Sequence, residues 1–153
     1  MPMRFFSLLA FALFSCLCSA QDLSQDKIDA MMQKYSDAWS DADATLISNS
    51  IYSTPFSVYT DHKTVLNTKD EVYQWLANAF KQLEENKYSH SKVIEVTTLE
   101  NDQSKAIIKM SFTRYLKSGA VMGAKERHAY YIITAVNGKP MISALLGFTP
   151  ISE

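Results

Sequence analysis

Residues 68–86, TKDEVYQWLANAFKQLEEN, predict a helix with a clear start. Thr68 stands three residues before Glu71, the spacing of a capping box, in which the two side chains accept hydrogen bonds from backbone amides at the helix start. Apolar residues then recur at three- and four-residue spacing, which is typical of an amphipathic helix with one buried face. They are Val72, Trp75, Leu76, Ala79, Phe80 and Leu83. We therefore expect a helix from about 69 to 85.

Beyond Asn86 the apolar period changes from helical spacing to two, which indicates strands. The expected strands lie near residues 89–99, 104–117, 122–136 and 139–148, with turns at 101–102, 118–119 and 137–138. Asn137-Gly138 is a strong signal for a two-residue hairpin. Because strands joined by tight turns pair antiparallel, these four are expected to form a meander.

Upstream of residue 68 the chain predicts two further helices and a strand. Apolar residues at helical spacing from Ser24 onward indicate a first helix, and Asp43 is the expected N-cap of a short second helix over about 44–50. Residues 56–60, FSVYT, are β-branched and aromatic and predict a strand, with a loop at 61–63. Helices first and a meander afterwards predict an α+β fold, with three helices packed on one face of an antiparallel sheet.

One long strand shows which of its faces meets the helices. Alternate side chains of a strand point to opposite faces of the sheet. In the strand near 104–117, one face is apolar and is expected in the core: Ala106, Ile108, Met110 and Phe112. The other face carries Lys105, Lys109, Ser111 and Thr113 and is expected to face solvent.

The overall composition is that of a globular protein rather than a disordered or strongly charged one. The chain has 153 residues, of which 47% are hydrophobic and 20% charged, with 15 Lys and Arg against 16 Asp and Glu. No block of like charge occurs. Nucleic acid and anionic lipid are therefore not expected as partners, since both favour clustered Lys and Arg.

The first twenty residues have the three parts of a secretory signal peptide. Met1 to Arg4 is short and basic, 5–17 is apolar, and Cys18-Ser19-Ala20 supplies small residues. A membrane-spanning helix needs about 20 apolar residues, so a permanent anchor is the weaker alternative, as is lipid attachment at Cys16. We expect a signal peptide at 1–20, a single domain at 22–153 without cysteine or a membrane span, and export to the periplasm or the medium.

The order of elements resembles the nuclear transport factor 2-like superfamily, which includes SnoaL-like cyclases and ketosteroid isomerases. The resemblance implies a curved sheet that wraps the helices into a cone with a pocket at its open end, and a homodimer formed through the outer sheet face. The residues that carry it are Tyr35-x3-Trp39-x3-Asp43, Ile51-Tyr52, Thr68-x2-Glu71-Val72 and Gly138-x3-Ile142.

The resemblance implies only part of the isomerase chemistry. Tyr35 is similar to the tyrosine that donates a hydrogen bond to the oxyanion in ketosteroid isomerases. The position of their catalytic aspartate looks like Thr60, with Asp61 one residue later, and their second acid has no counterpart near Tyr130 or Tyr131. The candidate catalytic residues are Asp61, Tyr35 and His90, of which Asp61 and His90 are the candidate bases.

Strand alternation places some candidates toward the pocket. His90 shares a face with Ile94, which predicts an inward side chain if that face is core; a solvated histidine is the alternative. Arg114 shares a face with Phe112 and would grip a carboxylate, unless it pairs with Glu126 instead. For the strand around His128 the sequence does not decide which face points inward. One face carries His128, Tyr130 and Ile132, and the other carries Arg127, Ala129, Tyr131 and Ile133.

The expected pocket combines aromatic, apolar and basic side chains. Tyrosines offer an apolar ring with a polar tip, which suits a small amphipathic or aromatic ligand. Asp61-His62 is a further candidate pair, although turn tips favour such polar residues for solvation alone. The expected ligand pocket is lined by Tyr35, Trp39, Tyr59, His90, Met110, Arg114 and Tyr130.

Neither a metal nor a cofactor is expected. His62, His90 and His128 stand alone, without a second ligand at metal-binding spacing. A glycine-rich phosphate loop and a Gly-x-Ser-x-Gly elbow are also missing from the sequence.

The sequence therefore predicts an exported domain that binds a small organic molecule and lacks a recognisable catalytic set. One alternative is a lyase, cyclase or isomerase of general acid/base type, with His90 or Asp61 as base and Tyr35 stabilising an oxyanion. Another is a homodimeric accessory module that uses the outer sheet face. The fold alone does not rank them, because one scaffold hosts unrelated functions.

Overall fold

The computed structural model describes residues 23–147, so the expected signal peptide at 1–20 lies outside the described residues, as do the ends of the expected domain 22–153. Within the described part, a short helix, α2, runs directly into one turn of π-helix, η1. The elements in chain order are α1 (Gln25–Ser40), α2 (Ala44–Leu46), η1 (Ile47–Ile51), β1 (Tyr52–Tyr59), β2 (Lys63–Leu66), α3 (Lys69–Glu85), β3 (Tyr88–Asn101), β4 (Lys105–Leu116), β5 (Arg127–Val136) and β6 (Lys139–Gly147).

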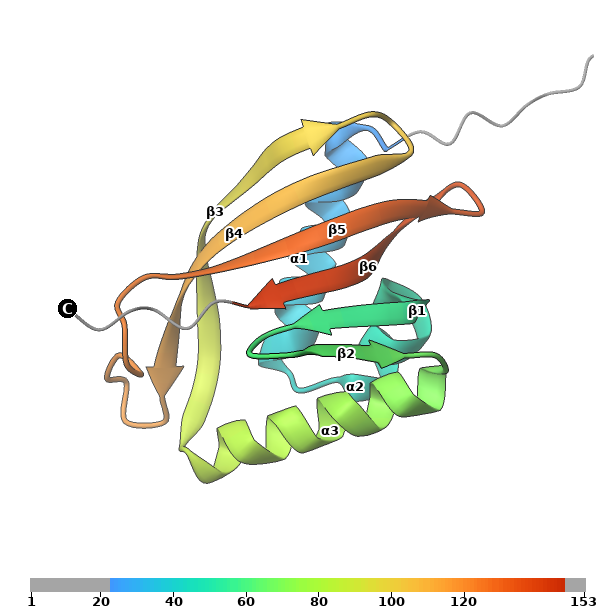
Figure 1. The fold of residues 1–153 in the computed structure, drawn as a ribbon. Coiled ribbons are helices and arrows are strands. Elements are labelled where there is room, and N and C mark those ends of the chain that lie inside the picture. Colours follow the sequence, from blue (N-terminus) through green and yellow to red (C-terminus); the bar gives the residue numbers. More distant parts are fainter. Residues whose placement is uncertain (1–22, 148–153) are drawn as a thin grey trace, which may run out of the picture.

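The strands form one curved sheet in the order β2-β1-β6-β5-β4-β3 (Figure 1). The predicted antiparallel meander of β3 to β6 is confirmed. β1 adds to β6 in parallel, and β2, which the sequence pattern did not indicate, pairs antiparallel with β1. The sheet is therefore mixed at one edge, and the predicted α+β architecture of three helices on a curved sheet is confirmed.

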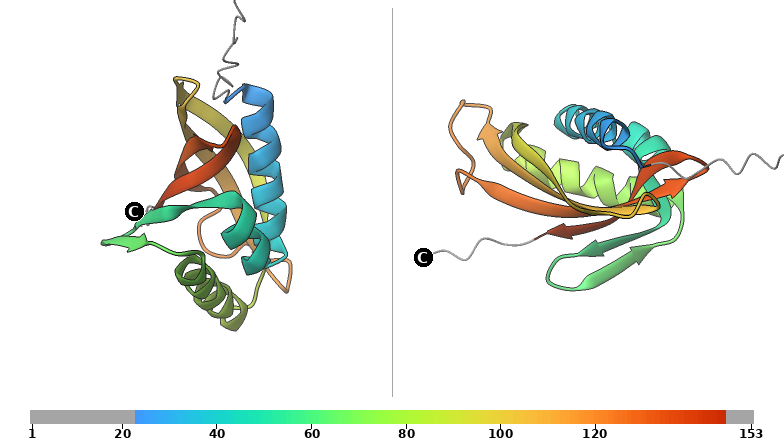
Figure 2. Two further views of the ribbon diagram at one scale, coloured as in Figure 1. Left: turned by 90° about the vertical axis from the view of Figure 1, so that its right-hand side faces the viewer. Right: turned by 90° about the horizontal axis from the view of Figure 1, so that it is seen from above.

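Both long helices lie on the concave side of the sheet (Figure 2). α1 packs against β3 and β6, and α3 crosses near β1, β2 and the start of β3. Burial of one face of each helix against one face of the sheet forms a single core. Its fully buried side chains include Ile28, Met32, Tyr52, Phe56, Val72, Leu76, Ile108, Ile133 and Ile142.

The local signals at the helix starts are confirmed. Thr68 Oγ1 accepts a hydrogen bond from Glu71 N at 3.2 Å, and Glu71 Oε2 reaches back to Asn67 N at 2.6 Å, one residue beyond the usual partner. Asp43 Oδ1 accepts from Leu46 N at 2.8 Å and caps α2. These side chains satisfy amides that a helix start otherwise leaves without a partner.

The alternation predicted for β4 is confirmed on its core face. Ala106, Ile108, Met110 and Phe112 are all buried. Two residues of the opposite face, Ser111 and Thr113, are also buried, which corrects the expectation of a solvated face. Ser111 Oγ lies 3.0 Å from Nδ1 of His128 on the paired strand β5, and Thr113 Oγ1 donates to Lys125 O at 2.6 Å, so the start of β5 and the segment before it cover this end of the outer face.

Strand β3 does not alternate regularly, and this overturns the placement of His90. The pairing of β3 with β4 shifts at three points, between 88 and 90, 93 and 95, and 98 and 100. Each extra residue at a bulge reverses which side chains face inward. Ile94 is consequently 55% exposed. His90 is exposed and stacks on Tyr115 with ring centroids 5.1 Å apart, so the prediction that it points into the cone is wrong.

The β5–β6 hairpin turn is confirmed at Asn137-Gly138. Both residues have positive φ, 51° and 74°, as a two-residue turn that matches strand twist requires. Among residues 23–147, no helix is both long and apolar enough to span a membrane.

Candidate functional site

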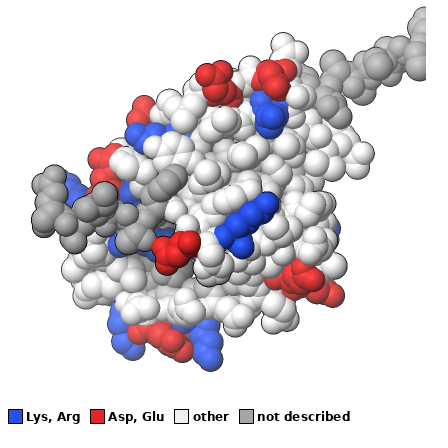
Figure 3. Space-filling view, in the orientation of Figure 1, with Lys and Arg blue, Asp and Glu red and all other residues white. Residues whose placement is uncertain are grey.

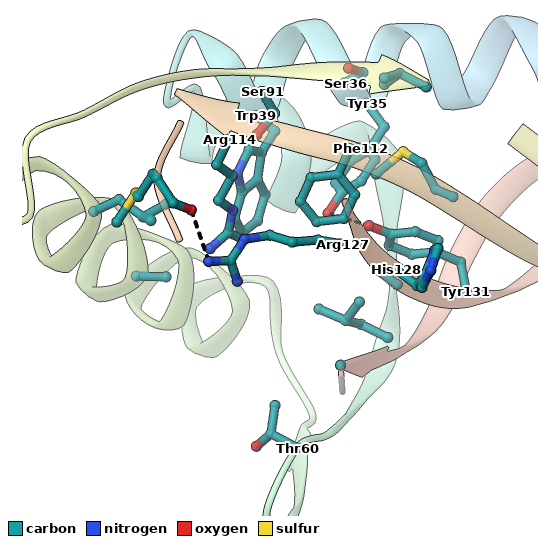
Figure 4. Close-up of a pocket in the computed structure, with 18 of the residues that line it drawn as sticks. Tyr35, Ser36, Trp39, Thr60, Ser91, Phe112, Arg114, Arg127, His128 and Tyr131 are labelled. Atoms are coloured by element: carbon teal, nitrogen blue, oxygen red, sulfur yellow. Dashed lines mark hydrogen bonds between the residues drawn. The ribbon is translucent and has the colours of Figure 1, made fainter. Parts of the chain in front are cut away.

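A pocket of about 470 Å³ opens between the two long helices and the inner face of the sheet. Its size falls in the range of small-molecule sites. α1 and α3 contribute aromatic side chains, while β4 and β5 contribute apolar residues and two arginines (Figure 4). The apolar part of the lining includes Trp39, Trp75, Val93, Met110, Phe112, Ala129 and Leu145.

Three buried tyrosines join their hydroxyl groups at the floor of this pocket. Tyr52 Oη donates to Tyr35 Oη at 3.0 Å, and Tyr131 Oη donates to the same oxygen at 3.5 Å. Burial removes water from all three hydroxyls, and this desolvation raises the pKa of each well above its usual value. Tyr35 accepts both hydrogen bonds, so its own O–H is left to donate to a third partner.

Aromatic contacts hold the walls of the pocket. The Trp39 ring meets the Phe80 ring edge to face, with centroids 4.9 Å apart, and is tilted against the Tyr35 ring at a centroid distance of 6.0 Å. Tyr131 meets Tyr35 edge to face at 5.3 Å. Such contacts restrict the rings to one arrangement, so the pocket is largely formed before any ligand enters.

The tyrosine cluster predicts a loss of stability at alkaline pH. Unfolded tyrosines ionise near pH 10, whereas the buried ones hold their protons to higher pH. Their contribution is therefore complete below about pH 10 and is lost as the pH rises toward the folded-state pKa values. We expect tyrosinate absorbance to show three of the eight tyrosines ionising only as the fold melts. Ionisation of all tyrosines near pH 10 with the circular dichroism unchanged would contradict this expectation.

Two arginines enter the pocket from neighbouring strands. Arg114 comes from β4, with its Cζ 5.5 Å from the centre of the Phe112 ring. Arg127 opens β5 and donates from Nη2 to Met122 O at 3.0 Å. The Nε atoms of both arginines are buried without a hydrogen-bond partner. Desolvation, followed by the nearby charge of Arg127, lowers the pKa of Arg114, so the protein environment itself disfavours this charge.

Polar residues form the rim of the pocket. Thr60 and Asp61 both line it, because β1 ends at Tyr59 and strand alternation no longer applies in the turn that follows. His128 lies at the rim and is about 40% exposed, with Nδ1 3.9 Å from Glu126 Oε1. Glu126 was the alternative partner expected for Arg114, but it contacts His128 and not Arg114.

The structure brings four of the seven predicted pocket residues together. Tyr35, Trp39, Met110 and Arg114 line the pocket, and so does Asp61. His90 does not line it, for the reason given above.

Two predicted tyrosines also lie elsewhere. Tyr59 is 38% exposed and has Lys63 Nζ 5.6 Å from its ring centre. Tyr130 faces a groove on the outer sheet surface, because its neighbours Ala129 and Tyr131 take the buried face of β5. The placement of Tyr59 and Tyr130 in the pocket was therefore wrong.

Other lining residues were not predicted. Arg127 and Tyr131 belong to the second of the two faces considered near His128, and only the structure selects that face as the inner one. Trp75 was expected in the helix stripe but not in the pocket. The role of Gly123 was also not predicted. It leaves room for the Arg127 side chain, because a Cβ atom at this position would lie 2.5 Å from Arg127 Nη2.

No group of three or more His, Cys, Asp or Glu residues that could hold a metal ion occurs within residues 23–147. Asp61 is the one carboxylate in the lining of the pocket, and His128 the one imidazole. The arrangement offers hydrogen-bond donors and positive charge to a ligand, rather than a set of metal ligands.

Comparison with known protein families gives one match over most of the chain. The model of a family described as "NTF2-like protein (DUF6841)" matches residues 25–143. No curated protein matches the chain.

Solved structures of similar fold include three bacterial proteins. An NTF2-like protein with a cystatin-like fold from Novosphingobium aromaticivorans is 8% identical, with a TM-score of 0.66 over 84% of this chain and 82% of that one. A protein of unknown function with a cystatin-like fold from Nostoc punctiforme is 10% identical, with a TM-score of 0.65 over 86% and 96%. An NTF2-like protein of unknown function from Shewanella oneidensis is 14% identical, with a TM-score of 0.57 over 81% and 98%. Identities this low establish a shared fold alone.

Proposed function

The chain belongs to the family of NTF2-like proteins (DUF6841) whose model covers residues 25–143. We propose that it is an exported domain that holds a small organic molecule in the cone. The observation that carries the proposal is the pocket of about 470 Å³. Its aromatic walls and its donors, Tyr35 and the two arginines, give a ligand both apolar contact and orientation.

Export is the part of the proposal that depends on the sequence. The basic start, the apolar run at 5–17 and the small residues before Gln21 support a cleaved signal peptide. The domain then reaches the periplasm or the medium without cysteine, so its stability there depends on its core and not on disulfides.

Native mass spectrometry of protein purified from its own host tests the binding proposal. We expect an additional mass of a small molecule on the wild-type chain. Ala79→Trp should remove this mass, because Ala79 lines the pocket from α3 and an indole there occupies the ligand's volume. Ala77→Trp is the matched control, since Ala77 is also partly exposed on α3 but lies outside the lining. A clean apo mass for the wild-type chain at every protein concentration would count against the proposal.

General acid/base catalysis in the same pocket is a second candidate. Asp61 in the lining is a potential base, and Tyr35 is a donor that could stabilise an oxyanion. Binding without reaction is favoured because His90, the other proposed base, lies outside the pocket and Asp61 is exposed at its rim.

A homodimer through the outer sheet face is compatible with either activity. An apolar groove of about 340 Å³ lies there, lined by Ile107, His128, Tyr130, Ile132 and Leu146. In Figure 3, which views the molecule from this side, uncharged residues occupy much of the surface. Apolar surface of this kind favours association, and the same native spectra distinguish one copy from two.

A further inference from the structure

Two positive charges share one wall of the pocket. Arg114 and Arg127 come from adjacent strands, and the Nε atoms of both are inaccessible to solvent and without a partner. A buried donor that forms no hydrogen bond is costly, and a second cation close by adds repulsion. Both side chains are partly exposed and line the pocket, so negative charge supplied there offsets the repulsion, although the buried Nε atoms themselves stay out of its reach.

The protein itself does not supply that charge within residues 23–147. Glu126 contacts His128, and neither arginine forms an ion pair with a described carboxylate. Asp61, the one carboxylate of the lining, is exposed at the rim where β1 ends. The partner of the two guanidinium groups is therefore to be sought in a ligand.

The backbone around Arg127 is shaped to hold its side chain. Met122 O accepts a hydrogen bond from Arg127 Nη2 at 3.0 Å. Gly123, with φ of +73°, has no side chain, and a Cβ atom at this position would clash with the same nitrogen. Arg114 lies over the Phe112 ring. In Figure 4 the two guanidinium groups lie close together, in agreement with the effect of the Arg127 charge on Arg114, and Trp39 lines the same pocket. Groups that are held in place before binding lose little entropy when a ligand arrives.

We propose that the ligand is a small organic acid whose carboxylate binds Arg114 and Arg127, with its ring or hydrocarbon body against Trp39, Phe112 and Tyr35. This inference rests on the proposed function and specifies the ligand class. The planar fork of a guanidinium matches the two oxygens of a carboxylate. The aromatic remainder of the lining favours an acid with an apolar body over an inorganic anion.

Isothermal titration calorimetry of the purified domain with 1-naphthoate, its neutral amide 1-naphthamide and inorganic phosphate tests the inference. For the wild type we expect naphthoate to bind more tightly than naphthamide by about 10- to 100-fold, the ratio that charge-assisted hydrogen bonds give. Phosphate should bind more weakly than naphthoate. Arg114→Met should remove the preference for the acid and leave binding of the amide nearly unchanged. The control Lys105→Met deletes an exposed cation at the other end of β4 and should alter neither.

A thermal melt without ligand distinguishes a binding arginine from a structural one. Because Arg114 has an unsatisfied Nε and a like-charged neighbour, Arg114→Met should melt at the wild-type temperature or above it. Arg114→Lys keeps the charge without the fork and should recover only part of the affinity for naphthoate.

Each contrary result has a distinct meaning. Equal affinity of the wild type for naphthoate and naphthamide, or unchanged acid binding by Arg114→Met, overturns the assignment of an acid but leaves small-molecule binding intact. If phosphate binds as tightly as naphthoate, the arginines form a site for simple anions and not for an organic acid, and the inference is overturned as well. If neither aromatic compound binds at millimolar concentration and the native mass is that of the apo chain, the proposed function fails, and the inference fails with it.

Discussion

Replacement of Phe56 by alanine is expected to lower the free energy of unfolding by about 3 to 5 kcal/mol, the range found for deletion of a buried aromatic side chain. Phe56 is fully buried in β1, and its ring stacks on Tyr52 with centroids 4.0 Å apart. It also lies 6.2 Å from the Trp75 ring on α3. Alanine would leave a cavity between the sheet and α3. This cavity would not close, because packed side chains on both sides hold their positions.

Urea denaturation, monitored by circular dichroism, measures this loss of stability. Val65→Ala in the neighbouring strand β2 is the control, because Val65 is 41% exposed and its removal should change stability by less than about 0.5 kcal/mol. A loss below about 1 kcal/mol for Phe56→Ala would mean that β1 and α3 do not share the packed core described above.

The elements that the sequence predicts well are those fixed by local chemistry. The capping box at Thr68, the stripe of α3 and the Asn137-Gly138 turn each depend on residues within a few positions of one another, and all three are confirmed. By contrast, the parallel pairing of β1 with β6 joins segments far apart in the chain. No local pattern specifies such a pairing, so it required the structure.

The candidate site was predicted only where strand alternation held. Arg114 and Met110 lie on the regular strand β4, and both line the pocket as alternation predicts. His90 lies on β3, where three bulges interrupt the register, and a bulge has no reliable signal in a single sequence. Strand alternation does not predict the position of Arg127, because both faces of β5 are equally apolar. Which face points inward depends on packing against the helices.

Replacement of Tyr35 by phenylalanine is expected to cost about 1 to 3 kcal/mol, although it removes only one oxygen atom. That oxygen accepts hydrogen bonds from both Tyr52 and Tyr131. Both donors are buried, but Tyr52 donates the shorter hydrogen bond, at 3.0 Å against 3.5 Å for Tyr131, and so loses more when the oxygen is removed. The penalty is therefore mainly that of the stranded Tyr52 hydroxyl.

The double variant Tyr35→Phe/Tyr52→Phe tests where the cost originates. Tyr52→Phe alone should cost less than Tyr35→Phe, because Tyr35 keeps its hydrogen bond from Tyr131. If the stranded hydroxyl of Tyr52 causes most of the loss in Tyr35→Phe, then removing that hydroxyl as well should recover stability. The double variant should accordingly be more stable in urea than the sum of the two single losses predicts. Strictly additive losses would show that the three hydroxyls contribute independently, and that the floor of the pocket is held by ring packing alone.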